Sequence, residues 1–304
     1  MHISVLLEES IKYLNLKEDS IIVDCTLGYG GHSSRILEQI KRGFLFAFDQ
    51  DREARTYSQE RLSKIGDNFE IIDSNFVNLK EKLKNKTNKV NGILYDLGVS
   101  SPQLDNDYRG FSFHNDAPLD MRMNQDQSFS AYNVVNEYSE YDLARIFKEY
   151  GEEKFASSIA KKIVKVRETK PIETTLELVE IIKSAVPEKY KREKHPARKV
   201  FQAIRIEVNK ELDVFENSLK QALDIIDING RICVITFHSL EDKICKRIFK
   251  EYSEIDANLS KLPIIPDELM PKFKVIANIA PEDNELDINN RARSARLRVI
   301  ERVR

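Results

Sequence analysis

The strongest constraint on the fold is an alternation of apolar runs and helix-like segments in the first hundred residues. Each apolar run is short, rich in β-branched or aromatic residues, and ends in glycine or polar residues, which is typical of a buried strand. Strands that alternate with helices of this length predict βαβ units, and therefore a parallel sheet covered on both faces. The four runs are 20–28, 43–51, 68–76 and 90–98.

The alternation stops after residue 104. Residues 131–187 have a helical pattern throughout, and 195–226 reads either as one long amphipathic helix or as a helix pair. Strand-like runs then return. They lie at 229–239, 273–281 and 294–303.

The return of strands after the helices indicates one sheet domain that is interrupted by an insertion. We predict an α/β fold with a doubly wound, mostly parallel, Rossmann-like sheet formed by residues 1–105 and 197–304. Residues 106–196 would form a helical insertion domain, to which we assign substrate recognition.

The composition predicts a cytoplasmic protein. Hydrophobic residues make up 41% of the 304 residues and charged residues 32%, and no apolar run has the length of a membrane span. The first residues carry acids and lack a basic region and a cleavage site, so we expect no signal peptide. Cys25, Cys233 and Cys245 are widely spaced, which favours reduced core thiols.

The formal net charge is −2, so any contact with nucleic acid has to come from local patches. Two segments are rich in Lys and Arg, 183–205 and the tail 291–304. Solvated helix and strand faces would explain either segment alone. Two such segments in a chain of balanced charge favour an anionic partner.

A glycine-rich loop follows the first strand and opens the first helix. Gly28, Gly30 and Gly31 fall within four residues there, and Asp49 ends the second strand. Glycine allows a sharp turn and a close approach to a ligand, and an acid at the second strand end can accept both hydroxyls of a ribose. The alternative is a tight turn beside a surface acid.

The spacing of the glycines selects among nucleoside cofactors. A dinucleotide fingerprint would require glycine at position 33, where the chain has Ser33. Adjacent glycines fit the loop type found where S-adenosylmethionine binds. His32, at the start of the helix, is a candidate for the methionine carboxylate, and Phe76, after the third strand, for the adenine face.

The fourth strand ends in "DLGVSSPQ", which begins at Asp96. Methyltransferases that act on exocyclic base amines carry polar residues and proline there, because an acceptor must take the N–H as nitrogen attacks the methyl group. Candidate acceptors are Asp96 and the backbone carbonyls of Ser100, Ser101 and Pro102, and the base would have to be flipped out. An ordinary turn is the alternative.

Asp120 in "PLDMRM" and His238 in "TFHSLED" are further candidates for the reacting end. His238 follows a strand and should face the same edge, although a structural histidine is an equal alternative. The five histidines are dispersed without metal-ligand spacing, so we predict no metal site.

Several blocks in this order resemble the MraW family, the ribosomal RNA small-subunit methyltransferase H family. They include "HISVLLEE", "DCTLGYGGHS", "DLGVSSPQLD", "PLDMRM", "HPARKVFQAIRIEVNKEL" and "RARSARLRV", and the resemblance extends from end to end. It implies S-adenosylmethionine-dependent N4-methylation of a cytidine in the decoding region of small-subunit (16S) ribosomal RNA. The implied partner is that RNA, within an assembled or late-assembly small subunit.

The resemblance also implies the cofactor contacts. It adds Gln103 to residues that the pattern itself suggests, namely Gly30, Gly31, His32, Asp49, Phe76 and Asp96. Since Asp96 cannot freely serve both the cofactor amine and the target amine, we give it the cofactor role. A carbonyl of Ser100, Ser101 or Pro102, or Asp120, would then receive the target N–H.

Two other functions compete with RNA methylation. One is a nicotinamide-dependent oxidoreductase, which Ser33 disfavours. The other is a non-catalytic RNA-binding assembly factor that uses the insertion and the Arg-rich tail. The sequence leaves open whether the chain is a monomer or a homodimer, and which basic segment contacts RNA.

Overall fold

The computed structural model describes residues 4–100, 103–104, 106–193, 195–255 and 266–304. It divides into two compact units, a first unit of Met1–Gly98 with Leu212–Arg304, and a second unit of Val99–Glu211. The expected insertion, 106–196, is therefore narrower than the second unit at both ends. At the carboxyl end the second unit extends further because helix α11 (Ala197–Asn209) packs with the other helices of this unit.

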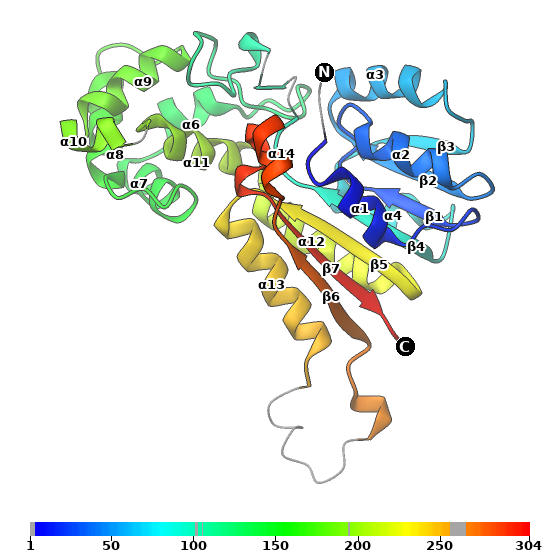
Figure 1. Ribbon diagram of the computed structural model, residues 1–304. Helices are drawn as coiled ribbons and strands as arrows, with labels where there is room; N and C mark the ends of the chain where they lie inside the picture. Colours follow the sequence, from blue (N-terminus) through cyan, green and yellow to red (C-terminus); the bar gives the residue numbers. More distant parts are fainter. Residues whose placement is uncertain (1–3, 101–102, 105, 194, 256–265) are drawn as a thin grey trace. The chain divides into compact units, whose positions relative to one another are not determined.

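The first unit contains a seven-stranded sheet in the order β3-β2-β1-β4-β5-β7-β6 (Figure 1). The first five strands in this order run parallel, whereas β7 is antiparallel to both β5 and β6. This is the mostly parallel Rossmann-like sheet predicted from the alternation. The strands are β1 Ile21–Asp24, β2 Phe44–Asp49, β3 Phe69–Asp73, β4 Val90–Asp96, β5 Ile226–Thr236, β6 Phe273–Ile279 and β7 Arg296–Arg302.

Helices cover both faces of this sheet, as a parallel sheet requires (Figure 1). Successive strand residues point to opposite faces, so that Ile22 packs into one apolar cluster and Val23 into the other. Helices α1 and α2 contribute to the Ile22 face, and α4, α12 and α13 to the Val23 face. These helices are α1 Leu7–Leu14, α2 Gly31–Gln39, α3 Arg52–Leu62, α4 Leu79–Leu83, α12 Glu211–Ile225, α13 Ser239–Ser253 and α14 Asp283–Ile288.

The second unit is helical and has a core of its own, built around residues such as Phe147, Ile163 and Ile204. Between residues 195 and 226 the structure has a helix pair, because Lys210 adopts a left-handed conformation that ends α11. The helices of this unit are α6 Ala131–Glu137, α7 Glu140–Glu149, α8 Ala156–Arg167, α9 Thr175–Ser184, α10 Glu188–Glu193 and α11 Ala197–Asn209. Across the described residues of both units, every helix is too short or too polar to cross a membrane.

Candidate active site

Three carboxylates lie at the carboxyl ends of neighbouring strands in the first unit. Asp24 ends β1, Asp49 ends β2 and Asp96 ends β4. Because parallel strands present their carboxyl ends at one edge of the sheet, the three acids share that edge, which is where α/β folds bind ligands. Asp49 and Asp96 were predicted from sequence, and Asp24 was not.

The glycine-rich loop is fastened to the second of these acids. The backbone N–H of Gly28 donates to Oδ2 of Asp49 at 2.8 Å, and its carbonyl accepts from the Ser58 hydroxyl at 2.8 Å. Gly28 and Gly30 have φ values of 50° and 73°, a region that favours glycine. A Cβ on Gly31 would lie 1.9 Å from the Ser4 hydroxyl, so a larger residue there would require the Ser4 side chain to move.

Asp24 also stabilises the glycine-rich loop through hydrogen bonds. Its Oδ2 accepts from the Ser33 hydroxyl at 2.7 Å and its Oδ1 accepts from the Thr26 N–H at 3.0 Å. The hydroxyl of Thr26 in turn accepts from the backbone N–H of Asp96 at 2.7 Å. Ser33, which breaks the dinucleotide fingerprint, thus joins helix α2 to the end of β1. Burial raises the pKa of Asp24.

Asp49 is placed to receive donors from a ligand. Its two oxygens already accept backbone N–H groups, from Gly28 and, at 2.8 Å, from Asp51. Each carboxylate oxygen has a further lone pair, so two more donors can be accommodated. Burial raises the pKa of Asp49 to about 7, while the two backbone N–H donors oppose that rise.

Asp96 lies beside His32, with Oδ2 at 3.5 Å from Nδ1 of the imidazole. Burial raises the pKa of Asp96 to about 8, and the negative charges of Asp24 and Glu241 add to the rise. Its Oδ1 is buried and accepts no hydrogen bond from the described residues. A buried carboxylate oxygen without a donor is costly, and a cationic or N–H-bearing ligand would relieve that cost.

Phe76 follows β3 and packs against other aromatic rings. It begins a short 3₁₀ helix, and its ring meets Tyr95 edge-on at 5.6 Å between centroids. Tyr95 meets Phe215 at 5.8 Å, and its hydroxyl hydrogen-bonds Ser218 at 2.8 Å. Helix α12 therefore fixes Tyr95, and Tyr95 fixes one edge of the candidate adenine-binding ring.

His238 has a structural task in this geometry. It is the N-cap of α13, and its Nδ1 accepts from the Glu241 N–H at 3.5 Å. Its Nε2 lies 3.0 Å from Oε1 of Glu241, which is itself almost completely buried. Nδ1 is therefore engaged at the helix start, whereas Nε2 is buried and makes no hydrogen bond to the described residues. A catalytic part for His238 stays a prediction.

The remaining candidates belong to the second unit. Gln103 is buried and accepts from the Ser100 N–H at 3.0 Å, and the Ser100 hydroxyl is buried without a partner among the described residues. Both oxygens of Asp120 accept from Arg122, each at 2.8 Å, which occupies the carboxylate. Ser101 and Pro102 lie outside the described residues.

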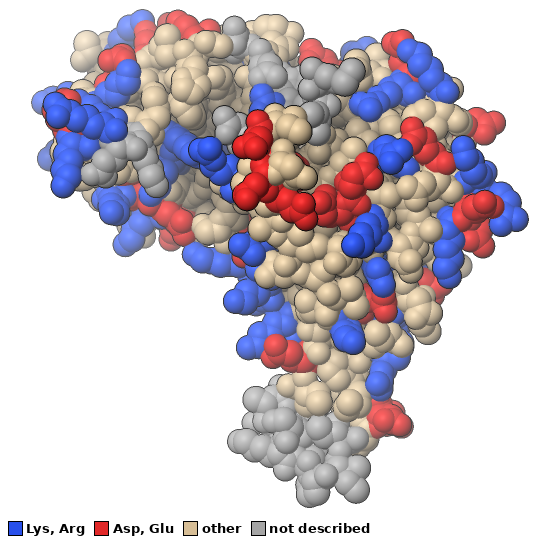
Figure 2. All heavy atoms as spheres, in the orientation of Figure 1, with Lys and Arg blue, Asp and Glu red and all other residues tan. Residues whose placement is uncertain are grey.

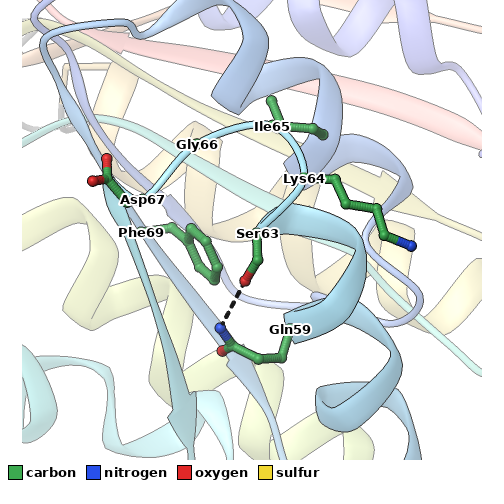
Figure 3. A pocket seen from close by; sticks show the side chains of 7 residues that line it. All are labelled: Gln59, Ser63, Lys64, Ile65, Gly66, Asp67 and Phe69. Atoms are coloured by element: carbon green, nitrogen blue, oxygen red, sulfur yellow. Dashed lines mark hydrogen bonds between the residues drawn. The ribbon is translucent and has the colours of Figure 1, made fainter.

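A hollow at the opposite edge of the sheet is separate from this site (Figure 3). It lies where the chain passes from α3 to the start of β3, between Gln59 and Phe69. Two of its polar side chains are already paired, since Gln59 donates to Ser63 and Lys64 contacts Glu60. It therefore lacks the unsatisfied buried groups found at the carboxyl edge.

Comparison with known proteins identifies the family. The profile of the MraW methylase family matches residues 1–303. A protein of Exiguobacterium sibiricum named ribosomal RNA small subunit methyltransferase H is 53% identical over 307 residues, which covers 100% of this chain and 98% of that protein.

Solved structures give weaker likenesses. An rRNA methylase from Streptococcus thermophilus has a TM-score of 0.46 at 13% identity and covers 100% of both chains. A methyltransferase from Streptococcus mutans, solved in complex with SAH, has a TM-score of 0.46 at 14% identity and covers 99% of both chains. The family assignment does not depend on them.

Membership of a methylase family also argues against the alternative function of a nicotinamide-dependent oxidoreductase. Since the family profile spans nearly the whole chain and the curated relative shares more than half of its residues, the chain belongs to the MraW methylase family and is a methyltransferase that uses S-adenosylmethionine.

Proposed function

We propose that this methyltransferase transfers a methyl group to the N4 amine of a cytidine in the decoding region of small-subunit ribosomal RNA. The observation that carries the proposal is the relative named ribosomal RNA small subunit methyltransferase H, which is 53% identical over the full chain. We further propose that it acts in the cytoplasm on an assembled or late-assembly small subunit, with the second unit recognising that substrate.

The carboxyl edge of the first unit fits the cofactor. S-adenosylmethionine supplies a methyl group on a positively charged sulfur. Asp96, with its unsatisfied Oδ1, would accept the amino group of the methionine part, and the neighbouring His32 would contact its carboxylate. Asp49 would accept the ribose hydroxyls, and Phe76 would pack on adenine.

The backbone of the glycine-rich loop completes the cofactor site in this proposal. Gly28, Gly30 and Gly31 keep side chains away from the space at the start of α2, where the helix N-terminus favours the carboxylate. Gln103 is a further cofactor contact in this proposal, on the family resemblance alone.

Methyl transfer releases one proton from the target amine, and the chain has to accept it. The N4–methyl bond forms as the sulfur–methyl bond breaks, and S-adenosylhomocysteine leaves. Both oxygens of Asp120 are occupied by Arg122, and Nδ1 of His238 is occupied by the N–H of Glu241. With Asp96 holding the cofactor, these engagements favour a backbone carbonyl of residues 100–102 as the acceptor of the N–H, which passes its proton to water.

Mass spectrometry of nucleosides tests the proposed function. Small subunits from cells that lack this modification are incubated with the enzyme and S-adenosylmethionine and then digested. We expect N4-methylcytidine with the wild-type chain and, at the same early time point, about 10²–10³-fold less with Asp96→Ala. Asp19→Ala, which changes an exposed acid, should behave as wild type. Another methylated nucleoside would overturn the base specificity, and cells that need the protein but tolerate Asp96→Ala would favour the assembly factor.

A further inference from the structure

Helix α8 of the second unit carries positive charge that its own sequence leaves uncompensated. Its twelve residues contain Lys161, Lys162, Lys165 and Arg167 and no Asp or Glu. Ile159, Ala160 and Ile163 form its buried face. Lys161 and Lys165, four residues apart, are exposed on its outer face, and the exposed Lys154 lies in the turn just before the helix.

Part of this arrangement works against the stability of the helix. Lys161 and Lys165 are a like-charge pair four residues apart, and Lys154 lies near the positive end of the helix dipole. Acids at positions 157 and 158 would pair with Lys161 and Lys162, but the chain has exposed Ser157 and Ser158 there. Small hydroxyl side chains leave the lysines accessible and can themselves donate to phosphate oxygens.

Helix α10 contributes two further exposed cations near the start of α8. Tyr190 holds α10 against the start of α8, since its ring contacts Phe155 at 5.0 Å and its hydroxyl donates to Glu153 at 2.7 Å. Lys189 and Arg192 on α10 are exposed. We call the resulting surface the basic face, and Figure 2 shows Lys and Arg gathered over α8 and α10. It consists of Lys154, Lys161, Lys165, Lys189 and Arg192.

Four other cations of the second unit differ from the basic face because they are paired with carboxylates. Lys170 contacts Glu177, Lys183 contacts Glu180, Lys191 contacts Glu188, and Arg205 forms a two-bond pair with Glu211. Among the residues that the structure describes, the five members of the basic face have no carboxylate within 4.0 Å.

The C-terminal arginines are also used inside their own unit. Arg298 makes two hydrogen bonds to Asp242, at 2.7 and 3.0 Å. Arg302 donates to the Ile226 carbonyl and Arg304 to the Asp267 carbonyl. The structure therefore separates the basic segments of the sequence into cations that brace the fold and cations that face outward.

We propose that the basic face binds the phosphate backbone of the ribosomal RNA substrate and so docks it on the second unit. The proposal rests on the proposed function for the identity of the RNA. Phosphate contacts by Lys and Arg position a nucleic acid without reading its sequence, and each one releases bound counterions. The face thus supplies affinity, while base choice is left to the active site.

The test compares two matched triple variants. Lys154→Ala, Lys161→Ala and Lys165→Ala change the basic face, whereas Lys41→Ala, Lys82→Ala and Lys84→Ala remove three exposed lysines of the first unit. Binding of fluorescent small-subunit RNA and of whole subunits is measured over a range of salt. We expect the basic-face variant to bind about tenfold more weakly and to lose about two units from the slope of log K against log salt.

Three further readouts distinguish docking from a loss of structure. KM for subunits should rise with kcat and S-adenosylmethionine affinity unchanged, thermal unfolding should not move to a lower temperature, and the triple Lys→Arg variant should restore binding. An unchanged salt slope overturns the proposal, as does an equal loss in the first-unit control. Loss of binding to anionic vesicles, with RNA binding intact, would also overturn it.

The proposed function can fail without this inference failing. If the wild-type chain produces no N4-methylcytidine, the chemistry assigned above is wrong. The salt slope of RNA binding still decides whether the basic face contacts phosphates, because it is measured without methyl transfer.

Discussion

The carboxyl edge of the sheet and the basic face both gather ionisable groups of one kind, but in opposite environments. Asp24, Asp49 and Asp96 lie at the carboxyl edge, where burial raises each pKa. Lys161 and Lys165 project into water, where like charges repel weakly. Burial raises the free energy of the ionised acids, so that a ligand that donates hydrogen bonds to them is favoured. Exposed lysines stay hydrated, so they can remain charged and available to a polyanion without destabilising the fold much.

The largest expected effect comes from removing the Asp96 carboxylate at the carboxyl edge. Asp96→Ala should lower kcat/KM for methyl transfer by about 10²–10³-fold, the scale on which one preorganised polar group acts. Single-turnover assays with S-adenosylmethionine measure it. A variant with activity within threefold of wild type would show that the carboxylate at the end of β4 is not needed.

The ion pair between Arg298 and Asp242 should contribute to stability, unlike the cations of the basic face. Arg298→Ala leaves Asp242 without its two hydrogen bonds and should lower the free energy of unfolding by about 2 kcal/mol. Arg293→Ala, an exposed neighbour in the tail, should change it by less than about 0.5 kcal/mol. Urea unfolding compares the two. Equal stabilities would contradict the bracing role that separates the tail from the basic face.

The pH dependence of stability sharpens the same contrast. Asp96 has a pKa of about 8 in the folded chain against 3.8 for the free side chain, so the folded state binds more protons between these values. Stability without cofactor should therefore fall as pH rises from about 5 to 8, by at most about 1.4 kcal/mol per pH unit for this group.

Asp96→Asn should make that part of the pH profile less steep, while the contribution of Asp49, whose pKa burial raises to about 7, remains. Asp19→Asn, at an exposed site, should leave the profile unchanged. Thermal unfolding at several pH values measures the slope. A profile that keeps its slope in Asp96→Asn would locate the responsible proton elsewhere.

The smallest effect concerns the helix of the basic face. Lys161→Ala with Lys165→Ala removes a like-charge pair and introduces a better helix former, so the chain should gain about 0.5 kcal/mol of stability. Lys82→Ala with Lys84→Ala, two exposed lysines of the first unit, provides the comparison. A loss of stability in the α8 variant would mean that these lysines support the fold, contrary to our assignment.

The sequence predicted the strand-end acids because a single strand and its last residue are local features. Asp49 and Asp96 could be placed from the apolar runs alone. Asp24 was missed because its role depends on Ser33 and Thr26, which meet it only when α2 folds onto the sheet. Likewise, the role of Tyr95 depends on helix α12, more than a hundred residues away.

Other features were readable but ambiguous. His238 followed by Glu241 has the spacing of a capping box, a signal that would have favoured the structural interpretation. Counting cations found the segment 183–205 but passed over α8, because charge density does not tell which lysines have partners. Only the ion pairs of Lys183, Lys191 and Arg205 separate those cations from the basic face.

The most direct test of the central claim maps the transferred methyl group in the RNA. Small subunits lacking the modification are treated with the enzyme and S-adenosylmethionine carrying an isotope-labelled methyl group, and fragments of the RNA are sequenced by mass spectrometry. We predict a label on N4 of one cytidine in the decoding region. A label on another base, on ribose or on a region outside the decoding centre would contradict the account.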